Sequence, residues 1–309
     1  MASADRLFWL QALTPLHLGA GKGEGYIDLP LLREKVTNFP FVPGSAVKGV
    51  FADSHGATDD ARSSNAVLQA AFGRAGDDTA NAGALVFTDA RLICLPVRSL
   101  YGTFAWCTSP FILGRLRRDL DAAGFEGWPD APDSITVAHV PASEKDPKLP
   151  HTRLSGGSGA AAMKIFLEDL DLSCRACAKA AQWASHIADA LFAAPAEASW
   201  RTQFRERFVV VPDDVFSFLA ETGTEVQPHV RIDPDFKRVA SGALWYEESL
   251  PAESILCGLL WCDAVRSKGP VTRENVLGLC QDSSLQIGGK ATTGKGRVRL
   301  RFQSPGGQP

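Results

Sequence analysis

The order strand, helix, strand occurs twice along this chain once its long inserts are set aside. Apolar runs of strand length cover 7–13, 84–95, 254–262 and 297–302, and helical periodicity covers 45–51 and 271–280. Two helices packed on one face of an antiparallel four-stranded sheet satisfy this order and leave the other face for a ligand. We therefore expect an α+β fold with a ferredoxin-like (RRM-like) core.

Long inserts and one hairpin enlarge that core. The chain has 309 residues, 45% of them apolar, which is ample for a sizeable core in one elaborated domain or two. We expect a single domain over 1–309, with insertions at about 52–82, 121–163 and 173–207, the second of them flexible. Two strand-like runs around Asp233-Pro234-Asp235 predict a hairpin over about 225–250.

Composition and charge limit the class of protein. The formal net charge is only −3, so a nucleic acid would have to be held by a local basic face. The sequence contains neither a signal pattern nor an apolar run of membrane-spanning length, which predicts a cytoplasmic protein with no membrane partner. Cys174 and Cys177 form the only C-x-x-C pair, in what reads as an alanine-rich helix, so packing is favoured over zinc.

Alternate glycines mark a loop near the start of the chain. Such residues pack no side chain and cost backbone entropy, so the loop favours close approach of a phosphate or a nucleic-acid backbone to the main chain. Its spacing does not fit the dinucleotide fingerprint G-x-G-x-x-G. The expected contacts in this loop are Gly19, Gly21, Lys22 and Gly23.

A second glycine loop, at 288–296, leads into the last expected strand. Its G-x-x-x-x-G-K pattern lacks the hydroxyl of a P-loop, because Gly296 follows the lysine, and a strand follows where a helix is needed. Backbone amides and lysines can nevertheless recognise a ribose-phosphate chain without reading its sequence. An ordinary solvent-exposed strand would also alternate arginines, here Arg297, Arg299 and Arg301, with apolar residues. The expected contacts are Gly288, Gly289, Lys290, Gly294, Lys295 and Arg297.

Five blocks of the sequence, in order, resemble the RAMP superfamily. They are TPLHLGAGKGEGYIDLPLLREK, PGSAVKGVF, AGALVFTDARLICLPVRSLYGTFAW, GALWYEESLP and IGGKATTGKGRVRL. Within that superfamily they are similar to the backbone ribonuclease subunits of Cmr (type III-B CRISPR) effector complexes. The similarity covers most of the chain and is weakest over about 121–160 and 174–205.

The resemblance implies roles for particular residues. The acid on which target cleavage depends corresponds to Asp28 of Ile27-Asp28-Leu29-Pro30, and the loop histidine of the family corresponds to His17. An acid of the W-x-E-E element is also implicated, which points to Glu247 or Glu248 without a choice between them. Without the resemblance, Asp28 reads as a surface acid at a turn, and the two glutamates as solvation of the hairpin.

Other residues would bind the guide RNA. Ser45, read as a helix N-cap, and Lys48, read as exposed, correspond to positions that grip the guide backbone. The hairpin corresponds to a thumb that displaces a guide nucleotide at regular intervals. The implied partners are guide RNA, complementary target RNA, further copies of this chain stacked head to tail, and other Cmr subunits.

RNA cleavage at Asp28 would require few reactive groups from the protein. The substrate's own 2′-hydroxyl can act as nucleophile, so the protein must align the phosphate, take a proton and offset charge. Since no D-x-D or D-x-E pair accompanies Asp28, we expect at most one loosely held divalent ion, Mg²⁺ first, with Asp28 as its ligand or as general base. The alternatives are a non-catalytic RNA-binding backbone subunit and a guide-processing nuclease.

Overall fold

One large mixed sheet organises the molecule. The computed structural model describes residues 6–21, 23, 25–74, 81–156, 163–233, 235–266 and 269–306. Twelve strands join in the order β15-β16-β1-β14-β6-β7-β11-β8-β10-β9, with β2 paired to β6 and β5 paired to β14. The α+β fold expected from the sequence is confirmed at this level. The strands are β1 (Arg6–Ala12), β2 (Phe41–Val42), β5 (Leu85–Phe87), β6 (Ala90–Arg98), β7 (Phe104–Thr108), β8 (Ala138–Pro141), β9 (Lys164–Leu167), β10 (Leu170–Cys177), β11 (Phe208–Val210), β14 (Ile255–Cys262), β15 (Ser283–Gln286) and β16 (Arg297–Gln303).

The centre of the sheet is the run β16-β1-β14-β6, in which every pair is antiparallel. Strand β1 lies between β14 and β16, so Trp9 is opposite Cys257 on one side and Arg301 on the other. Its residues 7–10 are buried on both faces of the sheet, which explains why the sequence there is an unbroken apolar run and does not alternate. The first and last described strands of the sheet are therefore neighbours.

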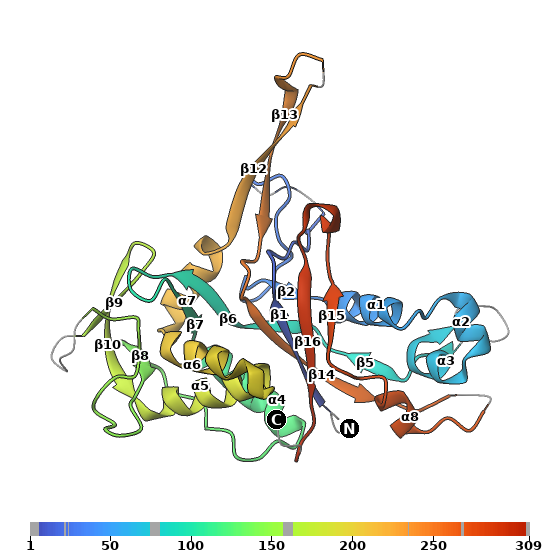
Figure 1. Ribbon diagram of the computed structural model, residues 1–309, viewed down its shortest axis with the longest axis horizontal. Coiled ribbons are helices and arrows are strands. Elements are labelled where there is room, and N and C mark those ends of the chain that lie inside the picture. Colours follow the sequence, from blue (N-terminus) through green and yellow to red (C-terminus); the bar gives the residue numbers. More distant parts are fainter. Residues whose placement is uncertain are drawn as a thin grey trace.

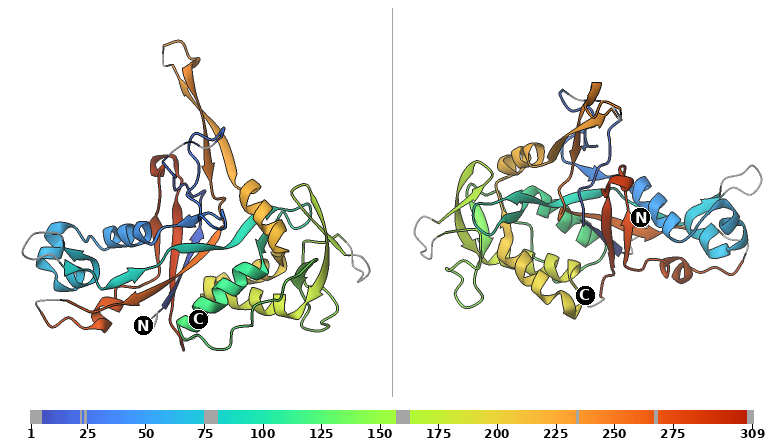
Figure 2. Two further views of the ribbon diagram at one scale, coloured as in Figure 1. Left: turned by 180° about the vertical axis from the view of Figure 1, so that it is seen from behind. Right: turned by 45° about the horizontal axis from the view of Figure 1, so that its top comes forward.

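Helices cover the sheet in two groups (Figures 1 and 2). Helices α1, α2, α3 and α8 lie on one side of β1 and β16, and α4 to α7 lie on the other. A single buried apolar cluster runs through both groups, including Phe51 of α1, Leu116 of α4 and Trp183 of α5. The helices are α1 (Gly44–Ser54), α2 (Asp59–Ser64), α3 (Ala66–Phe72), α4 (Pro110–Ala122), α5 (Ala178–Leu191), α6 (Ala198–Arg207), α7 (Asp213–Thr222) and α8 (Arg273–Leu277), with 3-10 turns η1 (Pro195–Glu197) and η2 (Ala291–Thr293).

One expected strand is divided in the structure, and a further hairpin follows later in the chain. The run 84–95 is broken at Thr88-Asp89 into β5 and β6, and Asp89 there accepts a 2.8 Å hydrogen bond from the backbone N–H of Gly44. The run 164–172 is a tight hairpin of β9 and β10, turning at Glu168 with φ of 47°. Cys174 and Cys177 lie on β10 and not in the helix that follows.

The expected insertions contain regular structure of their own. The segment 52–82 includes α2, α3 and the short pair β3 (Gly73–Arg74) and β4 (Asn81–Ala82). The segment 121–163, expected to be flexible, includes β8, which pairs with β10 and β11 and so belongs to the main sheet. Its SGGSG run extends to 159, and 157–162 lie outside the described residues.

A two-stranded hairpin projects from the top of the molecule in Figure 1. It is formed by β12 (Glu225–Ile232) and β13 (Val239–Ser249), paired antiparallel from Glu225–Ser249 outward with an irregularity after Val230. Towards its tip the hairpin exposes apolar side chains, among them Ile232 and Leu244. We call this hairpin the thumb. Across the described ranges, none of the helices has both the length and the apolar character needed to cross a membrane.

Candidate functional site

The glycine loop doubles back on itself beside the base of the thumb. Leu16 exchanges two backbone hydrogen bonds of 2.9 Å with Leu250, just after β13. Further along, Leu32 N–H donates to Leu18 O at 2.8 Å and Ala20 N–H donates to Pro30 O at 3.0 Å, so two extended arms face each other. In Figure 1 this dark-blue loop, the thumb base and the β15–β16 turn gather at the same end of the molecule.

Asp28 lies on the returning arm and is exposed to solvent, in agreement with the alternation of its neighbours. Its Oδ2 accepts a 2.8 Å hydrogen bond from the backbone N–H of Tyr246 on β13. The backbone of Asp28 and Leu29 also donates to Tyr246 O, at 3.2 and 3.1 Å. Among the described residues no Lys or Arg forms an ion pair with Asp28, whose side chain is exposed.

His17 is buried between the two glycine turns, at 5% exposure. Its Nδ1 lies 2.6 Å from Glu248 O, and because a carbonyl oxygen only accepts, Nδ1–H is the donor. A side chain at Gly19 would come within 3.1 Å of Nε2. These contacts favour a role in orienting the loop over direct contact with a phosphate.

The C-terminal glycine turn packs directly on this region. Gly289 N–H donates to His17 O at 3.0 Å, and Gly296 N–H donates to Pro15 O at 2.8 Å. A Cβ at Gly288 would lie 2.3 Å from His17 O, so only glycine permits this approach. The two glycine turns expected to hold one RNA strand are therefore adjacent, although they lie at opposite ends of the chain.

Glu247 points to this second turn and is 1% exposed, which contradicts its interpretation as hairpin solvation. Lys295 Nζ lies 2.7 Å from its Oε1, and Lys290 Nζ lies 3.2 Å from its Oε2. Burial acts to raise the pKa of Glu247, but hydrogen bonds and charge from the two lysines outweigh it and lower that pKa. Lys295 also donates to Ser249 Oγ at 2.9 Å and is buried, so its ammonium group is already occupied.

Glu248 points to the other face of the thumb base and is 3% exposed, so its interpretation as hairpin solvation is wrong as well. Its Oε2 accepts from Leu31 N–H at 2.8 Å. Its Oε1 accepts from Arg33 at 2.5 Å and from the Thr224 hydroxyl at 2.8 Å. The two adjacent glutamates thus bind the two glycine turns separately, Glu248 the first and Glu247 the second.

The start of α1 differs from the prediction. Pro43 is the N-cap and Ser45 lies within the first turn, because Asp89 satisfies the backbone N–H of Gly44 in place of a serine cap. Ser45 itself is exposed. Lys48 is half-buried and not exposed, and its Nζ donates to Leu85 O at 2.8 Å. Burial, together with the charge of Arg62, lowers the pKa of Lys48.

The last strand offers less free positive charge than its sequence suggests. Arg299 and Arg301 both pair with Glu197 of η1. Arg297 is exposed and makes no ion pair with any described residue. Gly19, Gly21, Gly23, Gly289 and Gly294 are also exposed, whereas Lys22 lies outside the described residues. The amides of Gly289 and Gly294 already donate within the protein, so the accessible groups expected at the RNA are the exposed glycine backbone of the first turn, Lys290, which is partly exposed, and Arg297.

Asp28 by itself offers a metal ion only one carboxylate. Over the described ranges, no group of three or more His, Cys, Asp or Glu side chains could hold a metal ion. A lone carboxylate suits Mg²⁺, which commonly takes one or two protein carboxylates and completes its octahedron with water and substrate phosphate oxygens. The residues present fit a single ion that arrives with RNA.

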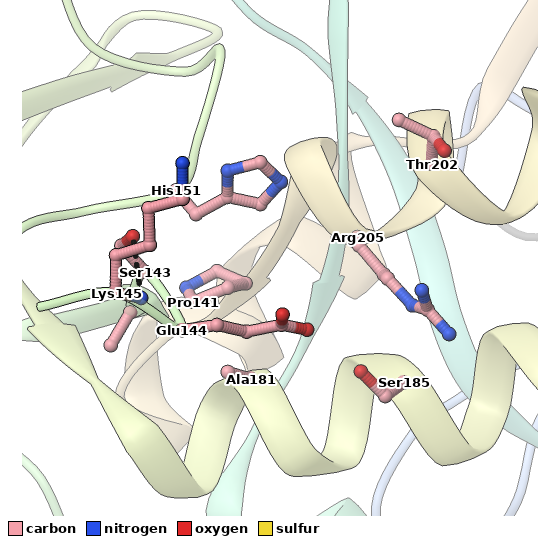
Figure 3. A pocket seen from close by; sticks show the side chains of 10 residues that line it. Pro141, Ser143, Glu144, Lys145, His151, Ala181, Ser185, Thr202 and Arg205 are labelled. Carbon is pink, nitrogen blue, oxygen red and sulfur yellow. Dashed lines mark hydrogen bonds between the residues drawn. The ribbon is translucent and has the colours of Figure 1, made fainter. Parts of the chain in front are cut away.

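The pocket drawn in Figure 3 lies in another part of the molecule. It has a volume of about 420 Å³ and contains none of the residues predicted from the sequence. Ser185 of α5 and Arg205 of α6 line one side, and Glu144 and His151 of the loop after β8 line the other. The candidate site is instead an open surface at the base of the thumb.

The whole chain was compared with known proteins. Residues 9–299 match the model of the RAMP superfamily. The chain belongs to the RAMP superfamily. This RAMP protein is 30% identical over 303 residues to the CRISPR system Cmr endoribonuclease Cmr4 of Pyrococcus furiosus, across 96% of this chain and 95% of the relative.

Solved RAMP structures have the same fold. The crystal structure of oligomeric Cmr4 from Pyrococcus furiosus matches with a TM-score of 0.70 and 26% identity, over 98% of this chain and 99% of the other. A chain in the cryo-EM structure of the type III-B Cmr-beta complex bound to cognate target RNA matches with a TM-score of 0.69, over 96% of both chains. Its identity is 21%, so that match shows the fold alone.

Sequence reasoning missed several residues that shape this RAMP site. Arg33 binds Glu248 although 215 positions separate them, and no local pattern signals such a contact. Tyr246 contributes through its backbone, to which composition gives no clue. Ser249 contacts the buried Lys295. The structure brings together Asp28, His17, Glu247, Glu248 and the turn 288–296, whereas it orients Lys48 and Lys295 towards protein atoms.

Proposed function

We propose that this RAMP protein is an RNA-guided endoribonuclease subunit of a type III-B CRISPR effector complex. One observation carries the proposal: the exposed carboxylate of Asp28 is fixed by Tyr246 at the thumb base, beside two adjacent glycine turns. The likeness to a Cmr endoribonuclease over 96% of this chain supports the same activity. The strand order β16-β1-β14-β6, with α1 and α8 as connecting helices, also supports the ferredoxin-like plan for the core.

In the proposed reaction the target 2′-hydroxyl attacks the adjacent 3′-phosphate to form a 2′,3′-cyclic phosphate, the P–O5′ bond breaks, and the 5′-oxygen leaves with a proton from water. Asp28 takes the proton of the 2′-hydroxyl, or it would hold one divalent ion, for which Mg²⁺ is the first candidate. When bound, such an ion would offset negative charge on the phosphate. The exposed backbone of the first glycine turn, with Lys290 and Arg297 of the second, would keep the strand aligned with Asp28. His17 would hold the loops together through its hydrogen bond to Glu248 O.

The proposed partners are a guide RNA, a complementary target, other Cmr subunits and further copies of this chain. A solved relative is oligomeric, and a solved complex of the same fold holds target RNA. Copies stacked head to tail along the guide would cut the target once per subunit, because a heterologous contact repeats along a filament. The regular spacing of the thumbs would then set the spacing of the cuts.

The test compares two matched substitutions in a complex reconstituted with guide RNA and its partner subunits. Asp28→Asn keeps an oxygen for Tyr246 N–H but removes the charge, and Asp53→Asn changes an exposed acid on α1. With labelled complementary RNA and Mg²⁺, native protein and Asp53→Asn should give a ladder of evenly spaced products. Asp28→Asn should bind the target and leave it intact.

The same experiment separates this function from its alternative. If native protein binds the target and never cuts it, the chain is a structural backbone subunit. The hydrogen bond between Asp28 and Tyr246 favours that alternative as a second candidate, since it gives the acid a structural use. Equal cutting by native protein and Asp28→Asn would remove Asp28 from the mechanism.

A further inference from the structure

The returning arm of the glycine loop is held in register with β13. Asp28 and Leu29 donate to Tyr246 O at 3.2 and 3.1 Å, and Glu248 N–H donates to Leu29 O at 3.0 Å. The next backbone donor on the arm, Leu31 N–H, does not meet a backbone carbonyl and donates to the Glu248 carboxylate at 2.8 Å. A side chain therefore continues the ladder that fixes Asp28.

Arg33 completes this arrangement. Its Nη2 is 2.5 Å from Glu248 Oε1, and its Nη1 donates to Ala220 O at the end of α7 and to Asn38 O, at 2.9 and 2.8 Å. The guanidinium thus ties three segments together: the thumb base, α7 and the turn after the glycine loop. With Thr224 also donating to Oε1, both oxygens of Glu248 are occupied.

These contacts are inconsistent with Glu248 acting on RNA. At 3% exposure its carboxylate does not reach solvent, and the Arg33 side chain is 13% exposed. A general acid or base must come within hydrogen-bond reach of the proton it moves. A charge buried in a complete set of hydrogen bonds instead gives rigidity to the segments that it joins.

We propose that Arg33 and Glu248 are positioning residues that hold the Asp28 carboxylate in line with the scissile phosphate. The inference rests on the proposed function. It assigns the two adjacent glutamates to separate tasks. Glu248 fixes the arm that carries Asp28, and Glu247 fixes the turn 288–296 through Lys290 and Lys295. Neither Arg33 nor Glu248 touches the substrate.

The test uses single-turnover cleavage and target affinity in the reconstituted complex. Glu248→Gln keeps an acceptor for Leu31 N–H but loses the ion pair, and it should lower the cleavage rate constant at least tenfold with the target Kd unchanged within twofold. Arg33→Lys keeps the charge but cannot bond Glu248 and Ala220 O at the same time with the planar geometry of a guanidinium. It should show the same loss of rate and the same unchanged target Kd. Glu197→Gln is the matched control: it also breaks an ion pair with arginine, and it should cut at the native rate.

A double substitution decides how the effect is transmitted. If Glu248 works only through the placement of the Asp28 carboxylate, adding Glu248→Gln to Asp28→Glu, which keeps a carboxylate but moves it, should cost much less than tenfold in rate, because interacting residues are not additive. A further tenfold loss in the double variant would overturn the proposal and make Glu248 an independent participant. Native rates in both Glu248→Gln and Arg33→Lys would overturn it as well.

The controls distinguish failure of the positioning role from failure of the proposed function. If Asp28→Asn cuts as fast as native protein, the proposed function fails and this inference fails with it. If Asp28→Asn is inactive and the Arg33 and Glu248 variants cut normally, only the positioning role fails. Should Glu248→Gln not assemble, Arg33→Lys alone decides, because its side chain is partly accessible and its charge is retained.

Discussion

The backbone N–H of Tyr246 donates a 2.8 Å hydrogen bond to the carboxylate of Asp28. This contact joins a loop near the start of the chain to the root of the thumb, and it occupies one carboxylate oxygen while the other faces solvent. A carboxylate held in this way has a fixed direction, and no Lys or Arg in the described part of the chain forms an ion pair with it. The proposed chemistry depends on that direction.

The attacking group in this proposal belongs to the RNA. Replacing the ribose on the 5′ side of one cut by 2′-deoxyribose should therefore remove that product band and leave the other bands unchanged. Products from the unmodified positions should end in a 2′,3′-cyclic phosphate. Gel analysis of a target with one deoxy position tests both points. Cutting at the deoxy position would mean that water is the nucleophile.

Gly288 and Gly294 form a matched pair within one turn. Both have positive φ, 82° and 83°, but a Cβ at Gly288 would lie 2.3 Å from His17 O, and one at Gly294 would meet nothing within 4 Å. Gly294→Ala should lower the free energy of unfolding by about 1 kcal/mol through backbone strain alone. Gly288→Ala should lower it by roughly 2–4 kcal/mol, because it also forces the two turns apart. Denaturant titration of the isolated chain measures both, and equal losses would contradict the close approach.

Lys295 and Lys290 share a carboxylate but differ in burial. The Lys295 side chain is 9% exposed and that of Lys290 is 36% exposed. Lys295→Met leaves Glu247 buried without its nearer cation and should destabilise the fold by about 2–4 kcal/mol. Lys290→Met should change stability by less than about 1 kcal/mol and weaken RNA binding, with a shallower dependence on salt. Thermal melting and filter binding at two salt concentrations separate the two effects.

Glu197 links η1 to β16 and gives stability that depends on pH. Burial acts to raise its pKa, but hydrogen bonds and charge from Arg299 and Arg301 prevail and lower the pKa below its ordinary value of 4.5. A carboxyl with a depressed pKa stabilises the fold above that ordinary value and loses the effect as pH falls through the folded pKa. At pH 7 the free energy of unfolding of native protein should exceed that of Glu197→Gln by about 1–2 kcal/mol.

The difference in the free energy of unfolding between the two proteins should close as the pH falls below 4.5 and through the lower pKa of the folded state. Melting curves of native and Glu197→Gln protein at several pH values, taken in one buffer series, give the comparison. Because each pair is measured at the same pH, titration of other acids such as Glu34 cancels. A gap that widens in acid would mean that the folded pKa of Glu197 is raised.

Sequence patterns predicted those parts of the molecule that depend on near neighbours. The unbroken apolar run of β1, the paired runs of the thumb and the outward direction of Asp28 follow from periodicity over a few residues. The same local reasoning misplaced Lys295, since a lysine between two glycines reads as a loop residue until Glu247 is known to lie beside it. It also missed β8, whose partners β10 and β11 follow much later in the chain.

The residues around Asp28 show the same contrast between local patterns, which could be predicted, and long-range contacts, which could not. Its exposure could be predicted from alternation with Ile27 and Leu29, but the ion pair of Arg33 with Glu248 could not, because the partners are 215 positions apart. The N-cap of α1 was predicted at Ser45, two residues after the observed cap at Pro43, because Asp89 on another segment satisfies the N–H of Gly44. Long-range polar contacts complete the site, and they leave no periodic signal in the sequence.

The hydrogen bond from Gly296 to Pro15 joins residues that leave the ribosome almost a full chain length apart. While the polypeptide is being made, the aspartate emerges early and the turn that supports its loop emerges nearly last. A nascent chain that has not yet reached Gly296 therefore carries the aspartate without the turn that packs on its loop. The surface around Asp28 is completed only after both segments have been synthesised.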